Sequence, residues 1–261
     1  MPLLFWIIVF SLIGSALSVL AAGVFLLIPE QRREHLLPHG VSFAIGAMLG
    51  AAFLGLLPHA LENETISDAH HITMTVLFGI LGFFLLEKMV LWRHCHHDHC
   101  QIHGLEHSHN HKHKTAGYLI LVGDGFHNFV DGVLIAAAFL TDMHLGIVTA
   151  LAVAAHEVPQ ELGDFAVLLH SGFSRLRALL LNLLSSLATV LGAVLAYFSL
   201  SGMEHVVPFI IAIAAASFIY IAVADLIPGL HQRTQFKETM QQIIMIGAGV
   251  SLVFIAHANL H

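Results

Sequence analysis

Long apolar runs separated by short polar segments dominate the pattern along the chain. A helix needs about 20 mainly apolar residues to cross the hydrocarbon core of a bilayer, and each of these runs is at least roughly that long. Backbone N–H and C=O groups inside lipid must be paired within their own segment, so the runs are expected to be helices. The pattern predicts eight transmembrane helices, over residues 3–28, 38–61, 72–92, 116–140, 145–170, 177–200, 206–229 and 239–260.

Composition supports the same class of protein. Of the 261 residues, 57% are hydrophobic and only 10% are charged. An ordinary soluble domain has about 25% charged residues and cannot bury this much apolar surface. The two cysteines, Cys95 and Cys100, lie in one loop and indicate no disulfide framework. The expected fold is therefore an all-α polytopic membrane protein with a single membrane domain over residues 1–261.

The charged residues predict how the helices are oriented. All ten Lys and Arg residues lie at or beyond the ends of the first, third, fifth and seventh predicted helices, which places them on one side of the membrane. The opposite side carries no Lys or Arg, and its acidic residues are Glu62, Glu64, Asp68, Asp142 and Glu204. Because Lys and Arg are retained on the cytoplasmic side, that side is expected to face the cytoplasm and both termini are expected outside.

A histidine-rich insertion, residues 93–114, separates the third and fourth predicted helices. It includes HCHHDHCQIHGLEHSHNHKH, from residue 94 to 113. Imidazole and thiolate groups bind zinc-like metals, but no zinc-finger spacing is present. The insertion is therefore interpreted as a flexible cytoplasmic metal-binding tract, with a solvated linker of no specific role as the alternative.

The fourth and fifth predicted helices carry acidic and histidine residues where lipid would favour apolar ones. At about 100° per residue, the candidates on each helix share one face spanning roughly 100–140°. A short connection around residues 141–144 makes the two helices an antiparallel hairpin, in which Asn128 and Glu157 stand at nearly equal depth. The polar faces should therefore meet; they consist of Asp124, His127, Asn128 and Asp131 on one helix and His156, Glu157, Gln160, Glu161 and Asp164 on the other.

These carboxylates have no Lys or Arg deep in any predicted span to pair with. An ionised carboxylate near the centre of a membrane helix costs about 2.5–3.5 kcal/mol, so the group must be protonated, hydrated or bound to a cation. The histidines favour a transition metal over Na⁺ or Ca²⁺: Zn²⁺ first, with Fe²⁺, Mn²⁺ or Cd²⁺ nearly as suitable. The predicted metal site comprises His127, Asn128, Asp131, His156, Glu157, Gln160, Glu161 and Asp164.

Two details qualify this prediction. Asn128 and Gln160 are neutral and equally suited to hydrogen bonds between helices. Pro159 lies mid-span, and its ring leaves the carbonyl of Ala155 without a helical donor. Such a carbonyl is tolerated in a membrane where it lines a cavity or finds another partner, so Pro159 also points to a site.

The motifs HNFVDG (127–132) and HEVPQELGDF (156–165), the histidine-rich loop and the eight spans resemble the ZIP (Zrt-, Irt-like) metal transporter family. The resemblance covers essentially the whole chain, with HExPHExGD as the related subfamily motif. It implies an importer of divalent metal, commonly a homodimer, with two metal positions: one from His127, Asp131, His156 and Gln160, and one from Asn128, Asp131 and Glu157.

This chain departs from the family pattern at three places. Gln160 replaces the subfamily histidine or the bridging glutamate of other members, and Ala51 and Gly55 stand where relatives tend to have Asp and His. We therefore expect one well-formed metal position and a weak or absent second one.

Two other functions share parts of the pattern. An intramembrane zinc metalloprotease would use HExxH, but HEVPQ has Gln160 where the second histidine is needed. A cation-diffusion exporter usually has six spans and a soluble C-terminal domain. The preferred interpretation is a transporter rather than an enzyme, without a catalytic cofactor or a nucleic-acid partner, in the plasma or inner cell membrane.

Overall fold

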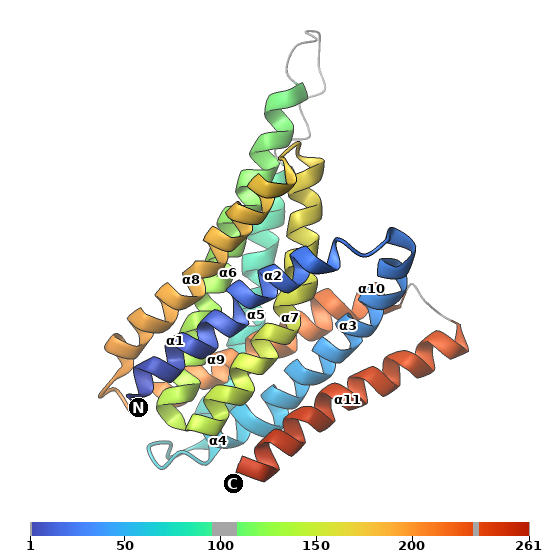
Figure 1. The fold of residues 1–261 in the computed structure, drawn as a ribbon. Helices are drawn as coiled ribbons and strands as arrows, with labels where there is room; N and C mark the ends of the chain where they lie inside the picture. Colours follow the sequence, from blue (N-terminus) through green and yellow to red (C-terminus); the bar gives the residue numbers. More distant parts are fainter. Residues whose placement is uncertain (1, 96–108, 232–234, 261) are drawn as a thin grey trace.

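The fold is a bundle of long helices, described here from a computed structural model over residues 2–95, 109–231 and 235–260 (Figure 1). Every regular element in these ranges is helical, which confirms the all-α prediction. Within them, seven helical stretches are long and apolar enough to cross a membrane: Leu3–Phe25, Gln31–Leu61, Ala69–Met89, Ile120–Thr141, Arg175–Leu200, Val207–Leu230 and Phe236–Ala256. The chain is a multi-pass integral membrane protein.

The helices follow one another in the order of the predicted spans. The N-terminal half contains α1 (Leu3–Gly14), α2 (Ala16–Phe25), α3 (Glu30–Gly50), the π-helical segment η1 (Ala51–Leu56), α4 (Leu57–Leu61), α5 (Ala69–Cys95) and α6 (His109–Thr141). The C-terminal half contains α7 (Met143–His170), α8 (Arg175–Leu200), α9 (Val207–Tyr220), the π-helical segment η2 (Ile221–Leu226), α10 (Ile227–Leu230) and α11 (Phe236–Leu260). Both chain ends lie at the end of the bundle that holds the α6–α7 turn (Figure 1).

Three predicted spans are interrupted rather than continuous. The first breaks at Ser15, where φ is −107° and ψ is −82°. The Ser15 hydroxyl donates a hydrogen bond of 2.7 Å to the carbonyl of Ser11, which competes with the helical backbone pattern. The spans predicted at 38–61 and 206–229 pass through η1 and η2, each of which ends shortly before a proline, Pro58 or Pro228.

The helices beside the histidine-rich insertion are longer than predicted. The spans expected at 72–92 and 116–140 correspond to α5 and α6, and both helices extend beyond the apolar residues that would cross the bilayer. Residues 93–95 and 109–114 of the expected flexible tract are therefore helical, because polar residues can extend a helix beyond the lipid. The remainder of the insertion, residues 96–108, lies outside the described residues.

α7 is the helix that the seven apolar stretches leave out. It has 28 residues, which is ample for a span, but its second half carries the polar group His156, Glu157, Gln160, Glu161 and Asp164. It starts immediately after Asp142, whose carboxylate accepts hydrogen bonds from the backbone N–H groups of His144 (2.8 Å) and Leu145 (3.0 Å). Asp142 thus caps α7 and fixes the tight α6–α7 turn that the sequence predicted.

Two helix pairs pack with their backbones in direct contact through glycine. A Cβ on Gly132 of α6 would lie 1.9 Å from the carbonyl oxygen of Thr189, and one on Gly192 of α8 would lie 2.1 Å from that of Phe129. α3 and α11 meet in the same way at Gly46 and Gly249. Small residues drive this kind of packing in membranes, where the hydrophobic effect does not hold helices together.

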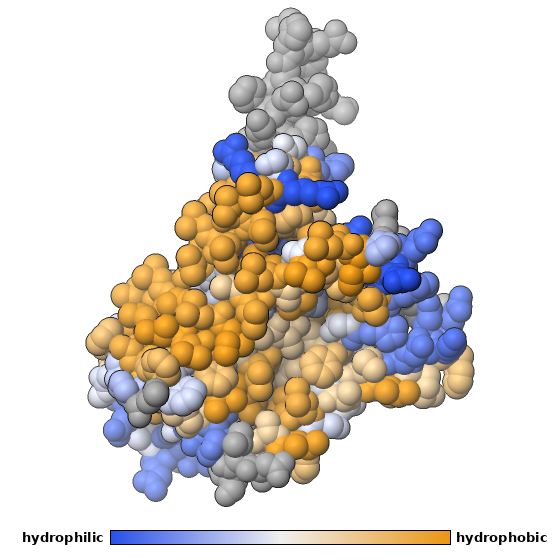
Figure 2. All heavy atoms as spheres, viewed as in Figure 1, coloured by the Kyte–Doolittle hydropathy of each residue, from blue (hydrophilic) through white to orange (hydrophobic). Residues whose placement is uncertain are grey.

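The surface matches a membrane setting. Figure 2 shows apolar side chains gathered over α1, α2 and α8, with hydrophilic ones concentrated toward the ends of the molecule. Exposed leucines on α8 include Leu176, Leu184 and Leu191, each more than half exposed. α6 and α7 lie behind this apolar surface and bury most of their facing residues, so their polar side chains are enclosed by the bundle.

Candidate metal centre

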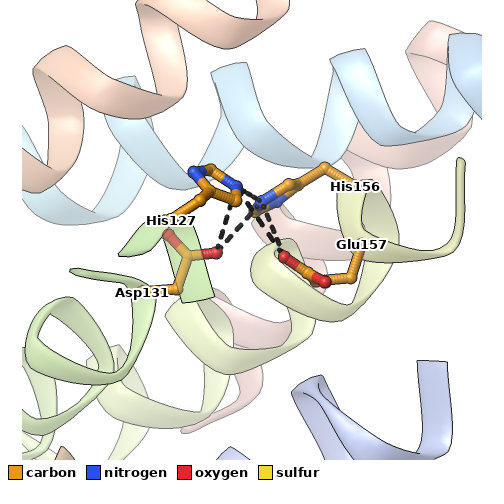
Figure 3. Close-up of side chains that lie close together, drawn as sticks. All are labelled: His127, Asp131, His156 and Glu157. Carbon is orange, nitrogen blue, oxygen red and sulfur yellow. Dashed lines mark hydrogen bonds and ion pairs between the residues drawn. The ribbon is translucent and has the colours of Figure 1, made fainter. Parts of the chain in front are cut away.

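Four side chains from α6 and α7 converge on one point inside the bundle (Figure 3). His127 and Asp131 stand one helical turn apart on α6, while His156 and Glu157 are adjacent on α7. Each offers one donor atom, and these four atoms all lie within 4.8 Å of one another. Among the described residues this is the only group of three or more His, Cys, Asp or Glu side chains so arranged.

The individual distances have the scale of a metal coordination shell. The Nε2 atom of His156 lies 3.1 Å from Oδ2 of Asp131 and 3.4 Å from Nε2 of His127. His127 Nε2 lies 3.7 Å from Asp131 Oδ2 and from Glu157 Oε1, and His156 Nε2 is also 3.7 Å from Glu157 Oε1. Tetrahedral ligands about 2.0–2.2 Å from a zinc ion stand roughly 3.3–3.6 Å apart, which matches this spacing.

A backbone hydrogen bond orients the His156 ring. Its Nδ1 atom lies 3.1 Å from the carbonyl oxygen of Ala152, which can only accept, so Nδ1 carries the proton. In the neutral ring the lone pair is then on Nε2, the atom that faces the other three donors. This is the usual way in which a protein presents an imidazole to a metal.

The two carboxylates in the group have no hydrogen-bond partner among the described residues. This holds for both oxygens of Asp131 and both oxygens of Glu157, and both residues are 0% exposed. Leaving charged oxygens buried without donors is costly, and no Lys or Arg approaches them within ion-pair distance in the described chain. A divalent cation at the centre of the group would satisfy these oxygens and the imidazole lone pairs together.

A cavity of about 700 Å³ reaches this group from one side. His127, His156, Pro159 and Gln160 line it, which accords with the expectation that Pro159 marks a site. The other lining residues come from the halves of the helices nearest the Lys/Arg-bearing ends, including Glu87 on α5 and Asp225 in η2. His127 is the most accessible of the four donors, with 24% of its side chain exposed.

The opposite side of the group is closed by tight packing. Every residue from Leu134 to Phe139 on α6 is buried. On α7, Gly146 sits directly against the ring of Phe139, where a Cβ would approach to 2.2 Å. The group is therefore reached from the Lys/Arg end and sealed toward the α6–α7 turn.

The remaining predicted site residues lie near the four donors but outside their cluster. The Asn128 amide donates to Asp124 Oδ1 (2.9 Å), and its oxygen accepts from the hydroxyl of Thr189 (2.8 Å), so it joins α6 to α8. Gln160 lines the cavity, and Asp164 lies beside Asp124. Glu161 is 0% exposed, with Asn182 near it, and neither side chain has a hydrogen-bond partner in the described part of the chain.

Comparison with known proteins decides the family. A family model described as "ZIP Zinc transporter" matches residues 3–257. The chain belongs to the ZIP family.

Individual ZIP relatives align over most of both chains. Zinc transporter ZIP13 of Pongo abelii is 32% identical over 267 residues, covering 94% of this chain and 77% of the relative. Zinc transporter ZIP13 homolog of Drosophila melanogaster is 30% identical over 314 residues, covering 95% and 88% respectively. Human zinc transporter ZIP13 is 30% identical over 297 residues, covering 94% and 80%. The family resemblance drawn from the motifs is confirmed.

Sequence reasoning missed the contribution of α8 to the setting of this ZIP site. Ser185 donates a 2.5 Å hydrogen bond to Asp124 Oδ2, and Thr189 holds Asn128 as described above. The signal available was the pair of hydroxyl residues one turn apart in NLLSSLATVLG, which is unremarkable in a membrane helix. Glu87 was also missed: it accepts a hydrogen bond from the hydroxyl of Tyr220, and both residues line the cavity.

Proposed function

We propose that this ZIP protein carries divalent transition-metal ions, zinc foremost, into the cytoplasm through the group formed by His127, Asp131, His156 and Glu157. The observation that carries the proposal is the spacing of the four donor atoms, 3.1–3.7 Å for the measured pairs, in a buried setting with no other partner for the carboxylates. The names of the relatives, all zinc transporters, support zinc as the ion.

The proposed direction of metal transport depends on the side to which the cavity opens. It extends from the metal group toward the ends of the helices that carry Lys and Arg, which by the positive-inside rule face the cytoplasm. The opposite side is packed shut, so this conformation is the one that would release metal inward. Entry from outside then requires a second conformation, in which α6 and α7 change their position relative to the rest of the bundle.

The proposed topology has eight spans, with α7 as the eighth, and both termini outside. α7 has the length of a span, and it packs between α6 on one side and α1, α2 and α3 on others, so its polar face is kept from lipid. The chain ends share the end of the bundle that has the α6–α7 turn (Figure 1), as an even number of spans requires.

One metal position is favoured over two. Asn128, which the family resemblance places at a second position, has its amide oxygen occupied by the Thr189 hydroxyl and its amide nitrogen by Asp124. Gln160 supplies no charge to bridge two ions. Fe²⁺, Mn²⁺ and Cd²⁺ remain possible cargoes of the same donor set, since imidazole and carboxylate ligands suit all of them.

Metal uptake into proteoliposomes tests the proposal. The natural chain is compared with His156→Ala combined with Glu157→Ala, and with a control, His205→Ala combined with Glu204→Ala, which changes the same residue types in an exposed loop far from the group. Zinc should accumulate on the side bearing Lys and Arg in the natural and control proteins. The site variant should lose at least nine-tenths of the rate, because half of the coordination shell is removed.

Two outcomes would contradict this proposal. Movement of zinc away from the Lys/Arg side would reverse the direction and favour an exporter. Tight zinc binding without movement would favour a sensor or the metalloprotease alternative, which a peptide-cleavage assay would then decide.

A further inference from the structure

A second cavity lies on the lipid-facing side of the bundle, away from the metal group. It has a volume of about 430 Å³ and is formed where α2, the start of α3, the end of α7 and the start of α8 come together. Its walls are apolar, with Leu20 and Val24 on one side and Leu169 and Leu176 on the other. Leu20, Val24 and Leu176 are each about half exposed or more, so the cavity continues the outer apolar surface of α2 and α8.

Two arginines are the only polar side chains that line this cavity in the described part of the chain: Arg33 and Arg175. Neither makes an ion pair with a described residue. The Nε atom of Arg33 is buried without a hydrogen-bond partner, which is unusual for a guanidinium donor. Two guanidinium groups that have no acidic partner among the described residues line an otherwise apolar cavity, and this favours an anion attached to an apolar group.

The helix ends at this cavity differ in sign. α3 and α8 begin there, with partial positive charge at their N-termini, whereas α2 and α7 end there, with partial negative charge, so the two arginines supply the net positive charge. The turn before α8 depends on Gly172, whose φ of 83° lets the chain reverse from α7 into α8. Figure 2 shows hydrophilic side chains at the edge of the apolar face over α2 and α8, the level at which lipid headgroups would lie.

We propose that this cavity binds one anionic phospholipid, with its phosphate between Arg33 and Arg175 and its acyl chains along the apolar walls. Arginine matches a phosphate with two parallel hydrogen bonds, and basic pockets between membrane helices are a recurrent setting for such headgroups. The lipid would come from the leaflet on the Lys/Arg side. This inference does not depend on the metal route, since it uses none of the metal-group residues.

Lipid binding to the purified full chain tests the proposal, measured by native mass spectrometry during titration with phosphatidylglycerol or phosphatidylcholine. One phosphatidylglycerol per chain should bind at least tenfold more tightly than phosphatidylcholine. Arg33→Gln combined with Arg175→Gln should abolish that preference. The matched control, Arg32→Gln combined with Lys237→Gln, removes two exposed charges outside the cavity and should keep the preference.

A second variant tests the apolar part separately. Val24→Trp keeps both arginines but fills the cavity, and it should weaken phosphatidylglycerol binding at least tenfold. Equal binding of the two lipids by the natural chain, or an equal loss in the control variant, would overturn the proposal in favour of diffuse electrostatic attraction. Displacement of the lipid by millimolar inorganic phosphate, together with full binding by Val24→Trp, would assign the arginines to a free anion instead.

Discussion

Glu157→Gln should make the protein more stable without metal and less stable with it. The natural side chain is 0% exposed, has no hydrogen-bond partner, and lies 3.7 Å from the nearest imidazole nitrogens. A charged carboxylate at this depth costs about 2.5–3.5 kcal/mol. The amide that replaces it is also unpartnered, at a cost of about 1–3 kcal/mol, so the midpoints of the two costs give an expected net gain of about 1 kcal/mol in a chelator.

With zinc present the order should reverse. At a zinc concentration of 100 times its Kd, binding stabilises the natural protein by about 2.7 kcal/mol. If loss of one charged ligand weakens binding about 100-fold, the variant gains only about 0.4 kcal/mol at the same concentration. The difference exceeds the advantage of the variant in chelator, so the two stability curves should cross.

Thermal unfolding in detergent, monitored by scanning fluorimetry in EDTA and in zinc, measures the stability difference without metal and the stabilisation by zinc. A change of 1 kcal/mol corresponds to about 2–4 °C for a chain of this size. Glu62→Gln, which makes the same substitution at an exposed position, is the control and should shift neither condition. A variant that is less stable than the natural chain in EDTA, or that zinc stabilises just as much, would refute the view that Glu157 is held for a metal.

Two further predictions concern how the site is supported. Gly132→Val should lower the free energy of unfolding by about 3 kcal/mol or more, because its Cβ would overlap the Thr189 carbonyl. The yield of folded protein on size-exclusion chromatography measures this effect. The control is Gly163→Ala, which adds a methyl group in open space and should be tolerated. Asp142→Ala should cost about 1 kcal/mol of stability by removing the α7 cap, while Asp142→Asn should cost less. Burial alone would raise the pKa of Asp142, but hydrogen bonds from the N–H groups of Leu145 and His144 outweigh it and lower the pKa. The cap should therefore contribute fully to the free energy of unfolding at neutral pH and lose its contribution only as the pH falls through the lowered pKa of Asp142. Melting curves measured across acidic pH test this, and a loss of stability that begins at higher pH would contradict it.

Most of the site could be predicted because it depends on local rules. Helical periodicity places His127 with Asp131 on α6, and the short α6–α7 turn brings His156 and Glu157 to the same depth. Burial then requires the carboxylates to be protonated, hydrated or bound to a cation, and the two histidines beside them favour a transition metal. These inferences need only the spacing of residues along two adjacent helices.

The parts that could not be predicted depend on contacts between distant segments. The direction of the Asn128 amide is decided by Thr189, 61 residues away, and nothing in either local sequence indicates that pairing. The π-helical segments η1 and η2 and the break at Ser15 alter spans whose mean hydropathy is high and does not indicate an interruption. α7 was predicted as a span over 145–170 from its apolar residues, although its polar residues exclude it from the seven most apolar stretches.

The glycine contact between α6 and α8 also predicts which inherited substitutions should be harmful. Because the two backbones touch at Gly132 and Gly192, α8 supports α6 directly, and so α8 helps to position two ligands although it contributes none. Harmful inherited substitutions should therefore gather at Gly132 and Gly192 as densely as on the ligands themselves. A saturation screen for growth under zinc limitation should show these two positions accepting only the smallest side chains, while the lipid-facing leucines of α8 exchange freely among apolar residues.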